Sequence, residues 1–361
     1  MIARAVIGAN FGDEGKGLVT DWLCMHGAGI VVRFNGGAQA GHTVVHEDGR
    51  RHVFSHFGSG TLRGVPTYLS KYFVVNPIAY FREKEELTTL GITPLVFAHP
   101  ECTVTTFVDM FINQELETRR GKDRHGSVGL GVNETVERSM LPELKITMAD
   151  LWNNSKSLES KLVDMCSTYS TFRIGSPIGN PDNMIHAFLQ GCSQIANEIH
   201  PLGISQCKDP VFEGAQGLLL DQNNKEFFPH LTRSNTGSHN VQALCTQAGI
   251  KDIETYYVSR TYLTRHGAGP LPGENANLSY PDNTNLKHQF QGTLRFAPLD
   301  YPALLERIKK DNTWGTSKLV LTHMDQLPPE VPADLYAWGP NWKWITKPGK
   351  ALNRACIKYR P

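Results

Sequence analysis

A glycine-rich loop near the N-terminus carries two acids and a lysine within a few residues. It begins at Gly8 and includes the sequence GDEGKG at 12–17. Such a turn between a strand and a helix presents backbone N–H groups to phosphate, and the helix dipole adds positive potential. Six residues separate Gly8 from Gly15, and Gly17 stands where a common P-loop has Ser or Thr. The loop therefore predicts an expanded, P-loop-like phosphate site; a tight turn with a surface lysine is the alternative.

A second segment of small residues, GGAQAGHT, occupies positions 36–43 and contains one titratable group, His42. Small residues let the backbone approach a ligand closely. A single histidine is more often structural than catalytic. If this segment lies beside the first loop, however, the Asp13 carboxylate, the Lys16 amine and the His42 imidazole converge as base, phosphate-binding cation and acid.

The elements that position these residues alternate between strand and helix. Residues 2–8 and 29–34 are predicted strands, and residues 16–26 between them have helical spacing. This order predicts an α/β fold with a mostly parallel central sheet, whose loops at the carboxyl ends of the strands form the site. A helical excursion is expected at roughly 130–200, and the whole chain, 1–361, is expected to form one α/β domain. Further strand-to-loop junctions are predicted at 210–217, 256–269 and 318–325.

Composition excludes several classes of protein. The chain has 361 residues, of which 40% are hydrophobic and 20% charged, with a net charge of +1. This near-neutral balance gives no reason to expect nucleic-acid binding, and no apolar run is long enough to cross a membrane. The N-terminus lacks the pattern of a signal peptide. The seven cysteines are scattered, which favours reduced thiols and a cytoplasmic protein.

Seven motifs then establish a resemblance. They occur in the order found in adenylosuccinate synthetases: GDEGKG (12–17), GGAQAGHT (36–43), GSVGLG (126–131), FEGAQGLLLD (212–221), TRSNT (232–236), RHGAGPLP (265–272) and LTHMD (321–325). The resemblance implies a carbon–nitrogen ligase that joins L-aspartate to C6 of a 6-oxopurine nucleoside monophosphate. A purine nucleoside triphosphate first phosphorylates the C6 oxygen, and Mg²⁺ assists. It also implies a homodimer.

The same resemblance assigns roles to single residues. Asp13 takes the purine N1 proton, His42 donates a hydrogen bond to the transferred phosphoryl group, and Lys16 offsets its charge. Gln216 contacts the purine. Mg²⁺ is held by the Asp13 carboxylate, the Gly41 carbonyl and phosphate oxygens, in keeping with its preference for oxygen ligands.

Three binding sets follow from the family's motifs. The triphosphate set is Gly12, Glu14, Gly15, Lys16, Gly17, Gly41, His42, Thr43, His323, Asp325, Trp338, Gly339 and Pro340. The purine monophosphate set is Asp13, Gln39, Ser127, Val128, Arg138, Gln216, Leu231, Thr232 and Arg265. The aspartate set is Gly292, Thr293 and Arg295. Arg138 aligns with an arginine that crosses a dimer interface to the partner's nucleotide phosphate; a solvated helix charge is the alternative.

Departures from the family's motifs concern the substrate. Cellular members have HNAGHT where this chain has AQAGHT at 38–43, and TTGRG where it has SVGLG at 127–131. Their arginine-rich aspartate loop, GATTGRRRR, corresponds to residues 289–296, which retain only Arg295. Loss of an arginine that contacts the ribose 2′-hydroxyl removes a reason to prefer ribose. The guanine-reading TKLD becomes Thr322-His323-Met324-Asp325.

This pattern resembles the viral branch of the family, which serves phages with 2-aminoadenine in their DNA. That branch joins aspartate to dGMP, giving N6-succino-2-amino-2′-deoxyadenylate, and some members use ATP or dATP in place of GTP. One viral type has Ser in place of the catalytic Asp, whereas this chain keeps Asp13. The alternative is an ordinary adenylosuccinate synthetase that acts on IMP with GTP. Intact Asp13, Lys16 and His42 argue against an inactive nucleotide-binding switch, and the first loop lacks the GxGxxG of a dehydrogenase.

Overall fold

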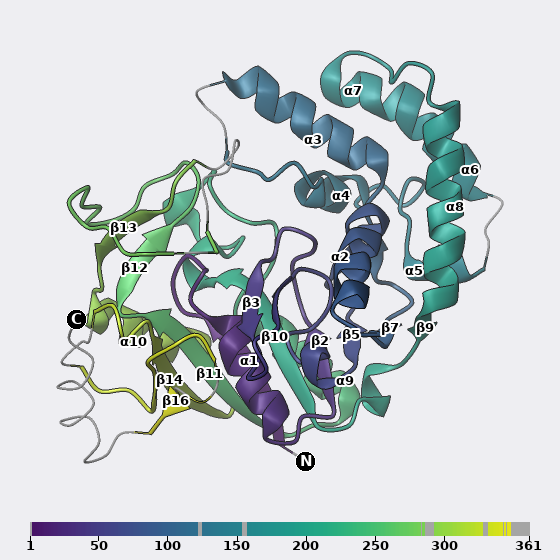
Figure 1. The fold of residues 1–361 in the computed structure, drawn as a ribbon. Helices are drawn as coiled ribbons and strands as arrows, with labels where there is room; N and C mark the ends of the chain where they lie inside the picture. Colours follow the sequence, from purple (N-terminus) through teal and green to yellow (C-terminus); the bar gives the residue numbers. More distant parts are fainter. Residues whose placement is uncertain are drawn as a thin grey trace.

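A large, mostly parallel sheet runs through the centre of the molecule (Figure 1). The computed structural model describes residues 2–121, 125–153, 157–282, 284–285, 292–327, 331–341, 343 and 345–347. The strand order in the sheet is β16 (Ile345–Thr346), β15 (Leu335–Ala337), β14 (Thr316–Thr322), β11 (Asp252–Arg260), β1 (Ile2–Gly8), β10 (Pro210–Gly217), β2 (Ile30–Arg33), β5 (Thr67–Leu69), β7 (Val96–Ala98) and β9 (Ile199–Pro201). Neighbouring strands pair in parallel except β15 and β16.

Three short strand pairs lie outside this sheet. They are the antiparallel pairs β3 (His42–Val45) with β4 (Arg51–Phe54) and β12 (Tyr262–Arg265) with β13 (Arg295–Pro298), and the parallel pair β6 (Val74–Val75) with β8 (Thr103–Val104). The strand β3 begins at His42, and the strand β12 ends at Arg265, so each has a predicted site residue at one end.

Helices pack on the sheet and gather beyond the β5–β9 end, at the upper right of Figure 1. They are α1 (Lys16–Met25), α2 (Pro77–Thr89), α3 (Phe107–Arg120), α4 (Val132–Arg138), α5 (Met148–Trp152), α6 (Ser157–Asp164), α7 (Ser170–Ile174), α8 (Asp182–Glu198), α9 (His239–Ala248) and α10 (Tyr301–Asp311). A π-helical turn at Met165–Tyr169 joins α6 to α7. No helix among the described residues is long and apolar enough to span a bilayer.

Local sequence explains where these elements start and stop. All four residues of β2 are buried, as expected of a parallel strand covered on both faces, and the three apolar residues Ile30–Val32 precede the buried Arg33. The helix α3 begins with a capping box, in which the Thr106 side chain and the Asp109 carboxylate satisfy each other's backbone N–H groups. Asn76 caps α2, and Pro77 takes the first helical position, where a missing N–H costs nothing.

The predicted fold class is confirmed. The strand expected at 2–8 is β1, the helix expected at 16–26 is α1, and the strand expected at 29–34 contains β2. The stretch expected to be helical at 130–200 holds α4 to α8, interrupted by loops. A shared apolar core joins the helices α5–α8 to β5, β7 and β9, with Phe73, Val104 and Ile112 fully buried in it.

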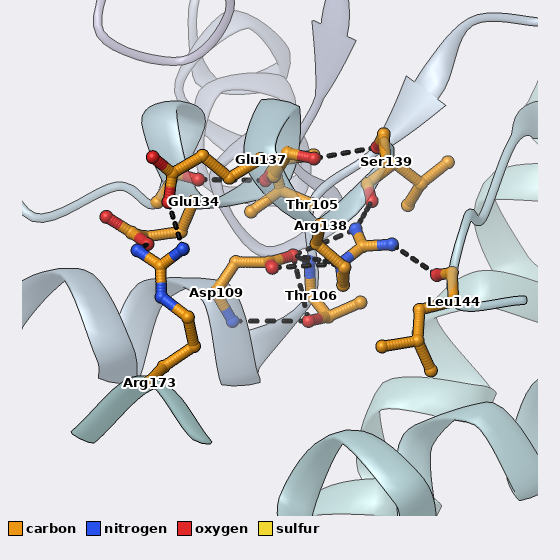
Figure 2. A network of polar contacts seen from close by, with 12 residues as sticks. Thr105, Thr106, Asp109, Glu134, Glu137, Arg138, Ser139, Leu144 and Arg173 are labelled. Carbon is orange, nitrogen blue, oxygen red and sulfur yellow. Dashed lines mark hydrogen bonds and ion pairs between the residues drawn. The ribbon is translucent and has the colours of Figure 1, made fainter. Parts of the chain in front are cut away.

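Arg138, the last residue of α4, lies inside this helical region (Figure 2). Its side chain is fully buried. Its Nε donates to Asp109 at 2.9 Å, one terminal nitrogen donates to the Leu144 carbonyl at 2.6 Å, and the other donates to the Val104 carbonyl at 2.8 Å and to Asp109 at 3.0 Å. The guanidinium thereby ties the end of α4 to the capped start of α3.

This geometry corrects one of the two sequence-based interpretations of Arg138. The residue is not a solvated helix charge, because its side chain is buried and its donors bind groups of its own chain. Its contact with a partner's nucleotide phosphate stays a prediction. Sequence spacing placed it on a short polar helix, and only tertiary packing buries it. Its acidic neighbours Glu134 and Glu137 pair instead with Arg173 (Figure 2).

The Arg138–Asp109 pair generates a stability prediction. Arg138→Ala should lower the free energy of unfolding by about 3–5 kcal/mol, because it leaves the buried Asp109 carboxylate without its cation. Chemical denaturation of the wild-type protein and the variant measures this difference. Arg82→Ala, at an exposed position on α2, serves as the control and should change stability by less than about 0.5 kcal/mol. Equal effects of the two substitutions would contradict the structural role of Arg138.

Candidate active site

A polar cleft opens at the carboxyl ends of four adjacent strands, β14, β11, β1 and β10. Ligands of open α/β sheets bind in this position. The residues that line the cleft are Asp13, Glu14, Gly15, Lys16, Gly17, Gln39, Ala40, Gly41, His42, Thr43, Gln216, Arg260, Asp282, Thr284, Asn285 and His323. The structure thus brings together most of the predicted catalytic and triphosphate-binding residues, although they come from distant parts of the chain.

The phosphate loop is built around two buried charged side chains. Glu14 and Lys16 are 2% and 3% exposed. The Glu14 carboxylate accepts the Asn10 backbone N–H at 2.7 Å, which folds the loop back on itself. A Cβ atom at Gly8 would lie 2.6 Å from the Gln216 backbone carbonyl oxygen and 2.3 Å from the Glu14 Oε2 atom, so only glycine fits where β1 enters the loop. The glycine at position 8 is therefore required for steric reasons, in addition to the role of the loop in binding phosphate.

Burial changes the ionisation of both side chains. It raises the pKa of Glu14 to about 7, although the nearby Lys16 charge lowers it in part. Burial also lowers the pKa of Lys16, against the opposing effect of Glu14 and Asp13. A cation that has lost its hydration gains from an anionic ligand, and so Lys16 is suited to hold a phosphate group.

His42 is oriented by a buried carboxylate that sequence analysis did not single out. Its Nδ1 lies 2.9 Å from Glu213 Oε1. The Glu213 carboxylate also accepts the Ser59 backbone N–H at 3.1 Å and the Ser59 hydroxyl, and it lies 3.9 Å from Arg33. Glu213 belongs to the FEGAQG motif, in which only Gln216 was given a role.

The charge of Glu213 fixes the tautomer of His42. Burial alone would raise the pKa of the Glu213 carboxyl, but His42, Arg33 and Ser59 outweigh it and lower this pKa to about 2. Burial lowers the pKa of His42, with Glu213 opposing the shift. Because an ionised carboxylate can only accept, His42 Nδ1 carries the proton. Its Nε2 atom is then left for a ligand in the cleft.

Backbone strain is concentrated at this cleft. Five non-glycine residues in the described part of the chain have positive φ, and three of them line the cleft: Asp13 (57°), Gln216 (62°) and His323 (58°). Such conformations cost about 1–3 kcal/mol each and persist where the surroundings enforce them. Their clustering independently marks the cleft as a functional site.

The donors present fit a magnesium ion shared with a phosphate. The Asp13 carboxylate and the Gly41 backbone line the same cleft. Within the described residues, no group of three His, Cys, Asp or Glu side chains forms a metal site. Mg²⁺ is commonly held by one or two carboxylates together with substrate phosphates, so this sparse oxygen set is of the expected kind.

The predicted base-binding segments are neighbours. The Met324 backbone N–H donates to the Ala337 carbonyl at 3.1 Å, which places the His323–Asp325 turn beside Trp338, Gly339 and Pro340. His323 lines the cleft, whereas Asp325 is exposed and is not among the lining residues. Burial lowers the pKa of His323 to about 3, so this imidazole is neutral.

The predicted monophosphate set is divided. Gln39 and Gln216 line the cleft, whereas Ser127, Val128, Leu231, Thr232 and Arg265 do not. A Cβ atom at Gly126 would lie 3.1 Å from the Gly267 Cα atom, so the loop before Ser127 packs against the loop after Arg265. The Arg265 guanidinium donates to the His230 carbonyl at 2.9 Å and lies over the Phe11 ring.

The predicted aspartate set lies beside Arg265. Arg295 pairs with Arg265 across β12 and β13, and its guanidinium binds Glu274 at 2.7 Å and the Gly267 and Gly269 carbonyls. Gly292 and Thr293 precede it and do not line the cleft. Residues 289–291 of the predicted aspartate loop lie outside the described residues.

Five cleft residues are in none of the predicted sets: Ala40, which lies in the GGAQAGHT segment, and Arg260, Asp282, Thr284 and Asn285. Arg260 ends β11, one of the strands whose carboxyl end was expected to carry site residues, and this position was the available signal. Asp282, Thr284 and Asn285 follow no recognisable motif, and only the fold brings them to the cleft.

Comparisons with known proteins agree with this geometry. The family model described as adenylosuccinate synthetase matches residues 5–327. The adenylosuccinate synthetase of Alkalilimnicola ehrlichii is 33% identical over 285 residues, which cover 74% of this chain and 64% of that protein. That of Paraburkholderia phymatum is 30% identical over 353 residues, covering 89% and 75%. The chain thus spans about 64% of the length of the first relative.

Two solved structures share the fold. A fully ligated adenylosuccinate synthetase from Plasmodium falciparum has a TM-score of 0.69 at 22% identity, covering 89% of this chain and 77% of that one. The succinoaminodeoxyadenylate synthetase of cyanophage S-2L, bound to dGMP and to dATP as an energy donor, has a TM-score of 0.63 at 16% identity. That comparison covers 99% of both chains.

The Glu213 carboxylate generates a pH prediction. Its pKa in the folded state, about 2, is below its ordinary value of 4.5, so it stabilises the fold above pH 4.5 and loses that contribution as pH falls towards 2. The wild-type protein should therefore exceed Glu213→Gln in unfolding free energy by an amount that is largest above pH 4.5. Denaturation between pH 7 and 2 measures this. The exposed Glu143→Gln control should show no comparable trend, and a constant Glu213→Gln difference would contradict the assignment.

Proposed function

The chain belongs to the adenylosuccinate synthetase family, and from this premise we propose that it is a carbon–nitrogen ligase. It joins L-aspartate to C6 of a purine nucleoside monophosphate at the expense of a purine nucleoside triphosphate. The observation that carries this proposal is the convergence of Asp13, Lys16, His42 and Gln216 on one cleft. These residues supply a base, a phosphate-binding cation, a hydrogen-bond donor and an amide for the purine.

The reaction needs two displacements. A purine C6 oxygen is a poor leaving group, so it is first phosphorylated: Asp13 takes the N1 proton, the C6 oxygen attacks the γ-phosphorus, and the bond to the β-phosphate oxygen breaks. The aspartate amine then attacks C6, and the oxygen leaves as inorganic phosphate. Phosphoryl transfer depends mainly on positioning and electrostatic stabilisation, which a cleft of fixed charges provides.

Different residues of the cleft have different roles in the phosphoryl-transfer step. His42, held by Glu213 through Nδ1, offers Nε2 to the transferring phosphoryl group and donates there when protonated. Lys16, stripped of water by burial, offsets the phosphate charge. Bound Mg²⁺, with Asp13 and Gly41 as protein ligands, would supply further charge neutralisation to the phosphate oxygens.

The monophosphate is dGMP in this proposal, and the product is N6-succino-2-amino-2′-deoxyadenylate. Guanine differs from hypoxanthine by a 2-amino group, which needs a hydrogen-bond acceptor. Gln39 contributes to the cleft, and its side-chain oxygen is buried without a hydrogen-bond partner within the described residues. The S-2L synthetase bound to dGMP and dATP, which aligns with this chain over 99% of both lengths, gives support from overall architecture.

The ordinary reaction, IMP with aspartate and GTP, is the second candidate. The named curated relatives are adenylosuccinate synthetases, and Asp325 offers a carboxylate at the base-binding turn for guanine N1–H and amino groups. The phosphoryl donor is ATP, dATP or GTP. The aspartate carboxylates are assigned to Gly292, Thr293 and Arg295, and the active form is assigned as a homodimer.

Asp13 is the residue on which the chemistry depends most. Asp13→Asn should reduce kcat by at least about 10²–10⁴-fold, the usual contribution of a general base, because an amide cannot take the N1 proton. Steady-state assays at saturating substrates test this, with circular dichroism to verify folding. Asp252→Asn, at the exposed start of β11, should retain wild-type turnover. Near-normal turnover of Asp13→Asn would exclude the base assignment.

A substrate matrix tests the proposed function itself. Purified protein should receive dGMP, GMP or IMP with Mg²⁺, aspartate and, separately, ATP, dATP or GTP, and mass spectrometry should identify succinylated products. We expect dGMP to be used with a much higher kcat/KM than IMP, since a site that hydrogen-bonds a substrate group rejects analogues lacking it by up to about 10⁴–10⁵-fold. Efficient product from IMP and none from dGMP would establish the ordinary reaction instead.

A further inference from the structure

Two residues without an assigned role contact Asp13, and they lie at the ends of two strands that are consecutive in the sequence. Arg260 is the last residue of β11, and His266 directly follows β12. Arg260 Nε donates to the Asp13 backbone carbonyl at 2.5 Å. His266 Nε2 lies 3.8 Å from the Asp13 carboxylate oxygen Oδ2. One residue therefore contacts the backbone of Asp13, and the other faces its side chain.

Arg260 is itself held firmly. It is 3% exposed, and its terminal nitrogens donate to the Tyr262 hydroxyl at 3.1 Å and to Asp282 at 2.7 Å. Asp282 in turn accepts the backbone N–H groups of Thr284 and Asn285. The Tyr262 ring stacks on Tyr280 with centroids 4.0 Å apart. With each nitrogen engaged, the guanidinium has a fixed direction towards Asp13.

His266 is fixed mainly by its backbone. The next residue, Gly267, packs against Gly126, and the chain before His266 is held in β12. The ring is 14% exposed, and its Nδ1 atom is buried without a hydrogen-bond partner within the described residues. Its Nε2 atom, in contrast, faces the exposed part of Asp13. The imidazole thus lies between the phosphate loop and the loop before Ser127.

Asp13 needs this support because its backbone is strained. Its φ of 57° lies in the left-handed region, which a non-glycine residue adopts at a cost that its surroundings must offset. Its side chain is 30% exposed, so packing alone does not fix the direction of the carboxylate. A base that is misplaced by about 1 Å can lose roughly 10²-fold in rate.

We propose that Arg260 and His266 are positioning residues for Asp13, an inference that rests on the proposed function. Arg260 holds the Asp13 backbone in its left-handed conformation, and the His266 Nε2–H donates to Oδ2. The other carboxylate oxygen, Oδ1, is then directed to the purine N1–H. The 3.8 Å separation exceeds a hydrogen bond, and contacts of this kind tighten when substrate binds.

The atom that makes the contact suggests a matched pair of variants. A glutamine amide nitrogen reaches about as far as the histidine Nε2 atom, whereas an asparagine amide nitrogen reaches only as far as Nδ1. His266→Asn should therefore lower kcat by roughly 10–100-fold with little change in the KM of the monophosphate. His266→Gln should recover kcat to within about threefold of the wild-type value. His186→Asn, exposed on α8, is the control.

A double-mutant cycle with Asp13→Asn separates positioning from other roles. If His266 acts through Asp13, adding His266→Asn to Asp13→Asn should cause no further loss, because coupled residues are not additive. Asp282→Asn, which weakens the anchor of Arg260, should likewise lower kcat in the wild-type background and not in Asp13→Asn. Thermal melting of every variant identifies unfolded protein.

The outcomes are distinct. Wild-type protein that forms no succinylated product from any monophosphate overturns the proposed function. Active wild-type protein with full turnover in His266→Asn, or with additive losses in the cycle, overturns the positioning role of His266 alone. A selective rise in the KM of the monophosphate would also overturn it, since it would make His266 a binding residue.

Discussion

The buried carboxylate of Glu213 is the interaction on which the cleft depends. It lies in the middle of β10, near the centre of the sheet, where it accepts hydrogen bonds from His42 and Ser59 and lies near Arg33. Isolated charges are costly to bury, and this one is stable only because its partners surround it. Glu213 determines the tautomer of His42. The tautomer in turn leaves His42 Nε2 as the ring atom available to a phosphoryl group in the proposed reaction.

A second constraint is the parallel arrangement of the strands. The carboxyl ends of β1, β10, β11 and β14 meet at one edge, so Asp13, Gln216, Arg260 and His323 become neighbours although β1 and β14 are some 300 residues apart in sequence. Three of these positions, Asp13, Gln216 and His323, also have strained backbones with positive φ. The rigidity of the sheet thereby supplies the preorganisation that phosphoryl transfer requires.

Much of this arrangement could be predicted from the sequence. The residues that the sequence analysis did not predict were missed for physical reasons. The phosphate loop, the parallel strands and the GGAQAGHT segment are local patterns, so glycine spacing and apolar runs were enough to predict them. Arg138 was misjudged because a polar side chain on a short helix looks solvated until α3 and Asp109 pack against it. Arg260 and His266 were missed since their contacts with Asp13 span about 250 residues of sequence, and no local pattern reports such a distance.

The positions at which this chain keeps or departs from the family's motifs also bear on the choice of substrate. The residues proposed to act at N1 and at the C6 oxygen lie on or beside the central strands and are intact. Departures from the family's motifs lie partly outside these strands, at 38–39, 127–131 and 292–296, and partly at the end of β14, where Thr322-His323-Met324-Asp325 replaces the guanine-reading motif. In the proposed reaction, a change of nucleotide requires no change in the charged centre of the cleft, because the C2 substituent and the ribose 2′ position are not themselves reacting atoms. Under the proposed function, an acceptor such as Gln39, which lines the same cleft, would select among purines at C2 while the residues of phosphoryl transfer stay unchanged.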